Sequence, residues 1–324
     1  MSDKSHIEWT DATWNPATGC TKISPGCAHC YIERTPPFRV NHRRFDAKGH
    51  IPIHLHPERL TQPLHWKRPR RVFVNSLSDL FHEGIHDDFI DQVFAVMALT
   101  PQHTYQILTK RPERMRHYCE SSERQNATGR IADIVMWIRR GRGDERPIAP
   151  LPHLAPGAIW YPLANVWLGV TCENQHFADE RIPLLLQTPA AVRFVSYEPA
   201  LGPVNFRWVN GWRDVISGKV EANGESTSRI DWVICGGESG PGARPMHPEW
   251  ARSVRDQCVA AGVPFFFKQW GEWIAPSQLQ KGMNLNCLHD GIGGTDYFRV
   301  GKKAAGRLLD GREWNEYPRK MVTA

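Results

Sequence analysis

The chain has 324 residues, of which 41% are hydrophobic, and a formal net charge of +6 at pH 7. A chain of this length can bury one large core or two modest ones. It contains no run of eighteen apolar residues, and its first residues lack the apolar core of a signal peptide, so we expect no contact with membranes and a cytoplasmic location. The mild positive charge permits a polyanionic partner without requiring one.

The expected elements begin with a short strand at residues 8–14, followed by a loop that carries three cysteines. Residues 38–70 are rich in Arg, His and Pro and are expected to be irregular. Buried strands and amphipathic helices then alternate. The strands are expected at 71–75, 104–109, 165–170, 191–196, 231–235 and 263–267, and the helices at 87–99, 177–186 and 248–261.

This alternation predicts an α/β fold with parallel strands and right-handed crossovers, in the form of a partial (β/α) barrel of about six strands. We expect the barrel to occupy residues 1–271, with insertions at about 113–164 and 206–230. Residues 272–324 are expected to form a C-terminal extension that packs on the barrel. The first insertion contains the Arg/Gly run 139–143, which is typical either of a segment that follows phosphates or of a solvated charged face.

Cys20, Cys27 and Cys30 lie within eleven residues, with the spacing C-x6-C-x2-C. Glycine and proline interrupt this stretch, so it is expected to be a loop that can wrap its thiols around one small object. Three thiolates are one short of a closed zinc site, but they suit a [4Fe–4S] cluster with one iron left open. Zinc completed by a histidine such as His54 or His56 is an alternative, as are three thiols without metal. A disulfide framework is not expected, because eight cysteines are too sparse for a disulfide-stapled domain in a chain of this length.

Polar residues follow each predicted strand. The carboxyl ends of parallel barrel strands share one rim, where active sites of such barrels lie, and a charge there is either solvated or part of a site. Two of these groups have plainer interpretations: Asp79 as a helix cap, and Lys110 with its neighbouring arginine as surface charge. The candidate site residues at these strand ends are Asn75, Ser76, Asp79, Lys110, Thr171, Glu173, Ser196, Glu198, Gly236, Gly237 and Glu238.

The sequence blocks that carry a family resemblance are 9–16, the cysteine loop, 74–81, 109–112, 236–238 and 310–312. With these blocks the chain resembles the radical S-adenosylmethionine (SAM) enzymes, although their common spacing is C-x3-C-x2-C. More closely, it resembles the phage-associated three-Cys-motif family of radical-SAM-like proteins. The Gly-Gly-Glu that commonly follows the second strand in radical SAM enzymes is replaced here by a segment that contains Asn75, Ser76 and Asp79.

The resemblance implies a [4Fe–4S] cluster on Cys20, Cys27 and Cys30, and SAM bound to its open iron and to the strand-end residues. It also implies reductive cleavage of SAM, hydrogen abstraction from a substrate, and a reducing partner of the flavodoxin or ferredoxin type. The phage association and the cationic insertion favour a nucleic acid or a nucleobase as the substrate. Two alternatives remain: a zinc-stabilised nucleic-acid-binding protein without catalysis, and a degenerate barrel that keeps a cluster for structure or electron transfer.

Overall fold

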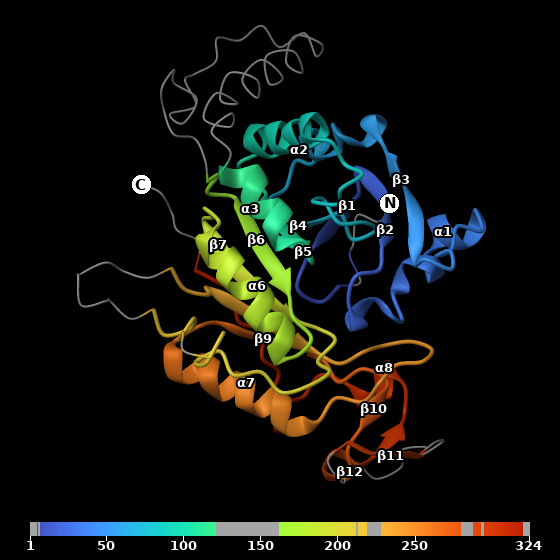
Figure 1. Ribbon diagram of the computed structural model, residues 1–324, viewed down its shortest axis with the longest axis vertical. Helices are drawn as coiled ribbons and strands as arrows, with labels where there is room; N and C mark the ends of the chain where they lie inside the picture. Colours follow the sequence, from blue (N-terminus) through green and yellow to red (C-terminus); the bar gives the residue numbers. More distant parts are fainter. Residues whose placement is uncertain are drawn as a thin grey trace, which may run out of the picture. The chain divides into compact units, whose positions relative to one another are not determined.

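The computed structural model describes residues 5, 7–120, 162–211, 213–218, 228–279, 288–292 and 295–319 (Figure 1). The Arg/Gly run 139–143 and most of the first predicted insertion lie outside the described residues, as do positions 219–227 of the second. Within the described ranges, no helix combines the length and apolar character needed to cross a membrane.

The main sheet has seven strands in the order β1-β4-β5-β6-β7-β8-β9, and the pairs β1–β4, β4–β5, β7–β8 and β8–β9 are parallel. The partial (β/α) barrel expected from the sequence is confirmed, with seven strands in place of about six. The strands are Ala12–Trp14 (β1), Arg71–Val74 (β4), Thr104–Thr109 (β5), Val166–Thr171 (β6), Val192–Tyr197 (β7), Trp232–Gly236 (β8) and Phe265–Gln269 (β9).

The helices between these strands follow the expected apolar periodicity. The predictions for 87–99 and 248–261 are confirmed, and the predicted helix 177–186 extends slightly at both ends. At the last of these helices, His247 accepts a hydrogen bond from the first turn, and Gly262 ends the helix in a left-handed conformation with φ of 65°. The helices are Pro36–Val40 (α1), Asp87–Leu99 (α2), Pro112–Glu120 (α3), Gln175–Gln187 (α6), Pro248–Ala261 (α7) and Lys302–Ala305 (α8).

The chain divides into two compact units, each built from three separate stretches. The first unit comprises Met1–Thr21, His50–Gly169 and Gln187–Val192, and the second comprises Lys22–Gly49, Val170–Leu186 and Arg193–Ala324. The predicted boundary at residue 271 stays a prediction.

In the first unit, α2 buries a nearly continuous apolar face that includes Ile90, Val93 and Phe94. A two-stranded sheet pairs β2 (Ala17–Thr21) with β3 (His50–Leu55) in antiparallel register. Two predictions are therefore wrong: Cys20 lies in a strand and not in a loop, and residues 38–70 are not irregular throughout. Besides β3, the latter contain short 3₁₀ helices at Pro57–Arg59 (η3) and Gln62–His65 (η4).

In the second unit, α7 lies along β8 and β9 (Figure 1). A small antiparallel sheet joins β10 (Trp273–Ile274), β12 (Thr295–Arg299) and β11 (Leu288–Ile292) in that order. The chain near its C-terminus then returns to the main strands: Phe267 N–H donates to the Trp314 carbonyl at 2.9 Å, and Trp232 Nε1 donates to the Glu316 carbonyl at 2.8 Å. Short 3₁₀ helices occur at Pro25–Cys27 (η1), Tyr31–Arg34 (η2) and Pro276–Gln278 (η5).

Candidate functional site

Cys27 and Cys30 lie on a tight turn in the second unit. Pro25 opens η1, because its fixed φ suits the first position of a helix and it has no N–H to satisfy there. The N–H of Cys30 donates to the Cys27 carbonyl at 3.3 Å, and the Sγ of Cys27 lies 3.7 Å from the Ser24 hydroxyl oxygen. Both cysteines are partly exposed, and so is Cys20 on β2. Within the described residues, none of the three forms a disulfide.

Glu173, a predicted site residue that follows β6, supports this turn. Its carboxylate is completely buried and accepts a hydrogen bond from Ser24 Oγ at 2.8 Å. Its other oxygen accepts one from Nη1 of Arg181 on α6 at 3.3 Å. A Cβ at Gly26 would lie 2.4 Å from Glu173 Oε1, so only glycine lets the turn approach this carboxylate.

Glu238, which follows β8, supports the same turn through Arg244. The backbone N–H and Nε of Arg244 each donate to Glu238 Oε2 at 2.8 Å, and Nη2 donates to Oε1 at 2.7 Å. Nη2 also donates to the Pro25 carbonyl at 2.9 Å. Bidentate pairing between a guanidinium and a carboxylate is strong and directional, so Arg244 ties the end of β8 to the cysteine turn.

The ends of β7 and β9 carry an ion pair. Lys268 Nζ lies 2.8 Å from Glu198 Oε1, and both side chains are largely buried. Gly236 leaves room for this pair, since a Cβ there would lie 3.2 Å from Glu198 Cδ. A Cβ at Gly237 would lie 2.0 Å from the Trp270 carbonyl oxygen, so the protein's own backbone accounts for this glycine.

The remaining predicted site residues in the second unit, Thr171 and Ser196, each accept a hydrogen bond at the backbone carbonyl. The Thr171 carbonyl accepts a hydrogen bond from Arg181 Nη1 at 2.9 Å, and the Ser196 carbonyl accepts one from Cys172 N–H at 3.0 Å. Both residues are buried. Their predicted contacts with a cofactor stay predictions.

In the first unit, Asp79 is the centre of a network at the ends of β4 and β5. Its Oδ1 accepts hydrogen bonds from Thr109 Oγ1 at 2.7 Å and from Phe81 N–H at 3.0 Å. Its Oδ2 accepts from Lys110 N–H and from Arg111 Nη1, each at 3.1 Å. The carboxylate thus has four donors within the protein, and its expected part in binding SAM stays a prediction.

The two residues that follow β4 join the same region to the N-terminal segment. Asn75 has a positive φ of 58°, and its Oδ1 accepts a hydrogen bond from Ala17 N–H at 3.3 Å. The hydroxyl of Ser76 donates to Asn15 Oδ1 at 3.1 Å. Both residues therefore fix the start of β2, the strand that carries Cys20.

Arg111 is a buried residue whose role was not predicted. The plainer interpretation of Lys110 with its neighbouring arginine was surface charge, but Arg111 is 7% exposed and pairs with Asp79 and Glu83. Burial opposes its charge, yet these carboxylates prevail and raise the pKa of Arg111. Its Nη2 also donates to the Thr21 carbonyl at 3.3 Å, beside Cys20. No sequence signal distinguishes this arginine from a surface one.

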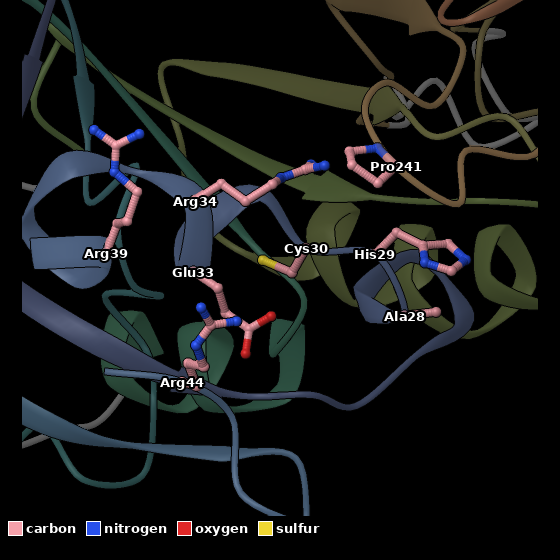
Figure 2. Close-up of a pocket in the computed structure, with 8 residues that line it drawn as sticks. All are labelled: Ala28, His29, Cys30, Glu33, Arg34, Arg39, Arg44 and Pro241. Carbon is pink, nitrogen blue, oxygen red and sulfur yellow. The ribbon is translucent and has the colours of Figure 1, made fainter. Parts of the chain in front are cut away.

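A cavity of about 490 Å³ opens beside Cys30 in the second unit. Figure 2 shows the thiol among the lining side chains, with Arg34 and Arg39 on one side and Glu33 and Arg44 on the other. Of the lining residues, only Cys30 was predicted to be part of a site. The sequence did contain a signal for this cavity, namely the arginines Arg34, Arg39 and Arg44 that follow the last cysteine of the motif. The lining residues are Ala28, His29, Cys30, Glu33, Arg34, Arg39, Arg44 and Pro241.

The candidate ligands of a metal group are the three cysteines of the motif. Within the described ranges, no three His, Cys, Asp or Glu side chains gather as ligands of one ion. His56, one of the two histidines suggested as a fourth zinc ligand, has Nε2 at 2.9 Å from Thr18 Oγ1 and Nδ1 at 3.1 Å from Glu58 Oε1. A [4Fe–4S] cluster distributes its thiolates over separate irons, so its ligands need not converge on one point. Three partly exposed thiols therefore suit such a cluster.

Residues 4–318 match the family described as protein of unknown function (DUF5131). The chain belongs to this family. The description does not name a phage-associated three-Cys-motif family, so that finer resemblance stays a prediction. No curated protein matches this DUF5131 chain. Among solved structures it is similar to a spore photoproduct lyase complexed with dinucleoside spore photoproduct, at 10% identity and a TM-score of 0.38, over 89% of this chain and 68% of that chain. A likeness of this size carries no argument about activity.

Proposed function

We propose that this DUF5131 protein is a radical SAM enzyme in which Cys20, Cys27 and Cys30 ligate a [4Fe–4S] cluster. The C-x6-C-x2-C spacing in the sequence is the reason for assigning these three cysteines to one cluster. When bound, such a cluster supplies the electron for reductive cleavage of SAM and thereby the means of abstracting hydrogen from a substrate. The observation that supports the proposal best is the turn at Cys27, because carboxylates from two parallel strand ends hold it in place.

The residues of the chain have distinct tasks in this proposal. Glu173 and Glu238 position the cysteine turn, one through Ser24 and the other through Arg244. The pair of Lys268 and Glu198 offers an ammonium and a carboxylate at the carboxyl ends of β7 and β9, where a bound ligand would need charge or a proton.

The other predicted positions are proposed to shape the cofactor site mainly by fixing the loops at the strand ends. They are Asn75, Ser76, Asp79, Lys110, Thr171, Ser196, Gly236 and Gly237. A flavodoxin- or ferredoxin-like protein is the proposed electron donor, and a nucleic acid or nucleobase is the proposed substrate.

The test uses full-length protein purified and reconstituted without oxygen. We expect about four irons per chain and an electron paramagnetic resonance signal of the reduced protein that changes when SAM is added. Cys20→Ser, Cys27→Ser and Cys30→Ser should each lower the iron content strongly. Cys119→Ser is the matched control, because Cys119 is also partly exposed but lies outside the motif, and it should keep its iron.

Each alternative predicts a different result. One zinc per chain, without iron and without a response to SAM, would refute the enzyme and leave a zinc-stabilised binding protein. Iron that never responds to SAM would point to a degenerate barrel. Iron content unchanged in the three motif variants would refute the assignment of the ligands.

A further inference from the structure

The segment that holds the cysteine turn carries a net positive charge. Residues 22–49 hold six lysines and arginines against two acidic residues, so this segment carries +4 of the chain's net +6. Arginines that gather at one cavity without enough acidic partners leave a positive potential, which attracts anions. Three of these arginines, Arg34, Arg39 and Arg44, line the cavity beside Cys30.

The guanidinium groups of the cavity are largely uncommitted. Among the described residues, the side chains of Arg39 and Arg44 form no hydrogen bond and no ion pair. Arg34 donates one long hydrogen bond of 3.4 Å to the Ser239 carbonyl. Glu33 is the acidic residue of the lining, and its Oε1 already accepts the Phe45 N–H at 2.8 Å. The positive charge of the cavity is therefore not balanced by a side-chain ion pair within the described lining.

The segment that carries these arginines is nevertheless well fixed. Phe38, next to Arg39 on α1, is 1% exposed and anchors the short helix. Phe45, next to Arg44, is held through its N–H by Glu33, and the Lys22 ammonium lies 4.5 Å from the centre of its ring. The neighbouring residues Phe38 and Phe45 hold this segment in place, so the guanidinium groups of Arg39 and Arg44 are available for a ligand.

The loop after β8 forms the opposite wall of the cavity. Gly240 has a φ of +95°, and a Cβ there would lie 2.0 Å from Nη1 of Arg34. The loop is held by a hydrogen bond from Gly240 N–H to Glu272 Oε1 at 2.8 Å and by one from Arg299 Nη2 to the Gly240 carbonyl at 3.1 Å. Gly240 therefore lies directly against the guanidinium of Arg34, and two hydrogen bonds hold this wall of the cavity in place.

We propose that this cavity binds the phosphate groups of a nucleotide or of a single-stranded nucleic acid. A guanidinium fork matches phosphate oxygens in a bidentate manner, and three forks supply more charge than one carboxylate needs. A volume of about 490 Å³ lies within the usual range of ligand sites. The inference rests on the proposed function only where it names the ligand as the substrate, because phosphate binding itself requires no cluster.

The experiment is a fluorescence anisotropy titration of the full-length protein. One probe is a fluorescein-labelled single-stranded oligothymidylate and the other is fluorescein-labelled AMP, each titrated over a series of KCl concentrations. The double variant Arg39→Gln/Arg44→Gln removes two charges and keeps polar side chains. Arg207→Gln is the matched control, since Arg207 is an exposed arginine of the same unit outside the cavity.

We expect the double variant to bind at least one probe about tenfold more weakly, while Arg207→Gln binds like the unmodified protein. For the oligonucleotide, the slope of log affinity against log salt should fall by about 1.4, because each lost phosphate contact removes about 0.7 on a single strand. Binding of labelled AMP with the same dependence on Arg39 and Arg44 identifies a free nucleotide as the ligand. Binding of the oligonucleotide alone identifies a strand.

The inference is overturned if neither probe binds, or if the double variant binds both as well as the control does. An unchanged thermal midpoint of the variants excludes unfolding as the cause of a loss. The two proposals also fail separately. Phosphate binding that depends on the two arginines, in a protein without iron or SAM cleavage, refutes the enzyme alone. SAM cleavage in a protein whose arginines bind no phosphate refutes only the cavity.

Discussion

At the scale of single residues, the cysteine turn depends on a buried ion pair. The side chains of Glu173 and Arg181 are 0% and 1% exposed. Ser24, which lies in the turn, donates a hydrogen bond to the Glu173 carboxylate and so links the turn to this ion pair. Removing one member of such a pair leaves the other charge buried without compensation, which is far more costly than removing both. The stability of the turn should therefore depend more on this pair than on any exposed one.

Arg181→Met should accordingly lower the free energy of unfolding by about 3–5 kcal/mol. Urea denaturation measures this loss, and Arg181→Met/Glu173→Gln should recover part of it because no buried charge is left alone. Arg116→Met is the control: its pair with Glu120 is partly exposed, and its loss should cost about 0.5 kcal/mol. Equal losses in the two single variants would contradict the argument.

His82 adds a dependence on pH. Its Nδ1 accepts the Gly84 N–H at 2.9 Å, so the ring is neutral, with its proton on the Nε2 that lies 2.9 Å from Thr21 Oγ1. Burial lowers the pKa of His82, and the positive charge of Arg111 lowers it further, while Glu83 and Asp79 act in the opposite direction. The unfolded chain therefore binds a proton more readily than the folded one at mildly acidic pH.

The stability that neutral His82 provides should be complete above a pH of about 6.5 and decline as the pH falls from there toward its folded pKa. Urea denaturation at about pH 7.5 and about pH 5.5 should show a smaller loss on acidification for His82→Gln than for the unmodified protein. Burial also lowers the pKa values of His56 and His103, so part of the loss should persist. An identical loss in both proteins would exclude His82 as a contributor.

At the scale of elements, Arg244 connects the end of β8 to the turn of Cys27, and its removal should loosen that turn. Charge-assisted hydrogen bonds contribute about 1.5–3 kcal/mol each, so Arg244→Gln should speed alkylation of the Cys27 thiol in cluster-free protein by about tenfold or more. Peptide mass spectrometry reads each cysteine separately, with Cys119 as an internal standard. Arg207→Gln is the control variant. A Cys27 rate that is the same in both variants would show that Arg244 does not restrain the turn.

Most of the helices and strands could be predicted from the sequence, but not all of them. The strands predicted from residue 71 onward and the helices α2 and α7 are confirmed because each is a strongly apolar or periodic stretch with clear ends, whereas of the strand predicted at 8–14 only Ala12–Trp14 forms. The pair β2–β3 was missed because Gly19 looks like a loop residue. In the structure Gly19 forms a bulge at φ +103°, and a Cβ there would lie 2.1 Å from the Pro52 carbonyl oxygen. Which strand-end carboxylates pair with Arg181 and Arg244 was not predictable, because these contacts depend on how distant stretches of chain pack.

At the scale of the whole molecule, the division of the chain into two compact units falls inside two strands. The boundary between them passes within β6, between Gly169 and Val170, and within β7, between Val192 and Arg193. A strand cannot keep half of its ladder when the other half unfolds without exposing unpaired backbone groups. The units are therefore expected to unfold together, although each is compact by itself.

Chemical denaturation should show this directly as one transition. Tryptophan fluorescence, which reports on Trp14 in the first unit and Trp232 in the second, should coincide with the loss of far-ultraviolet circular dichroism. Arg181→Met lies in the second unit and should nevertheless shift the whole curve to lower denaturant, with fluorescence and dichroism still superimposed. Two separate transitions, of which the variant shifts only one, would show that the units unfold independently and that the divided strands do not couple them.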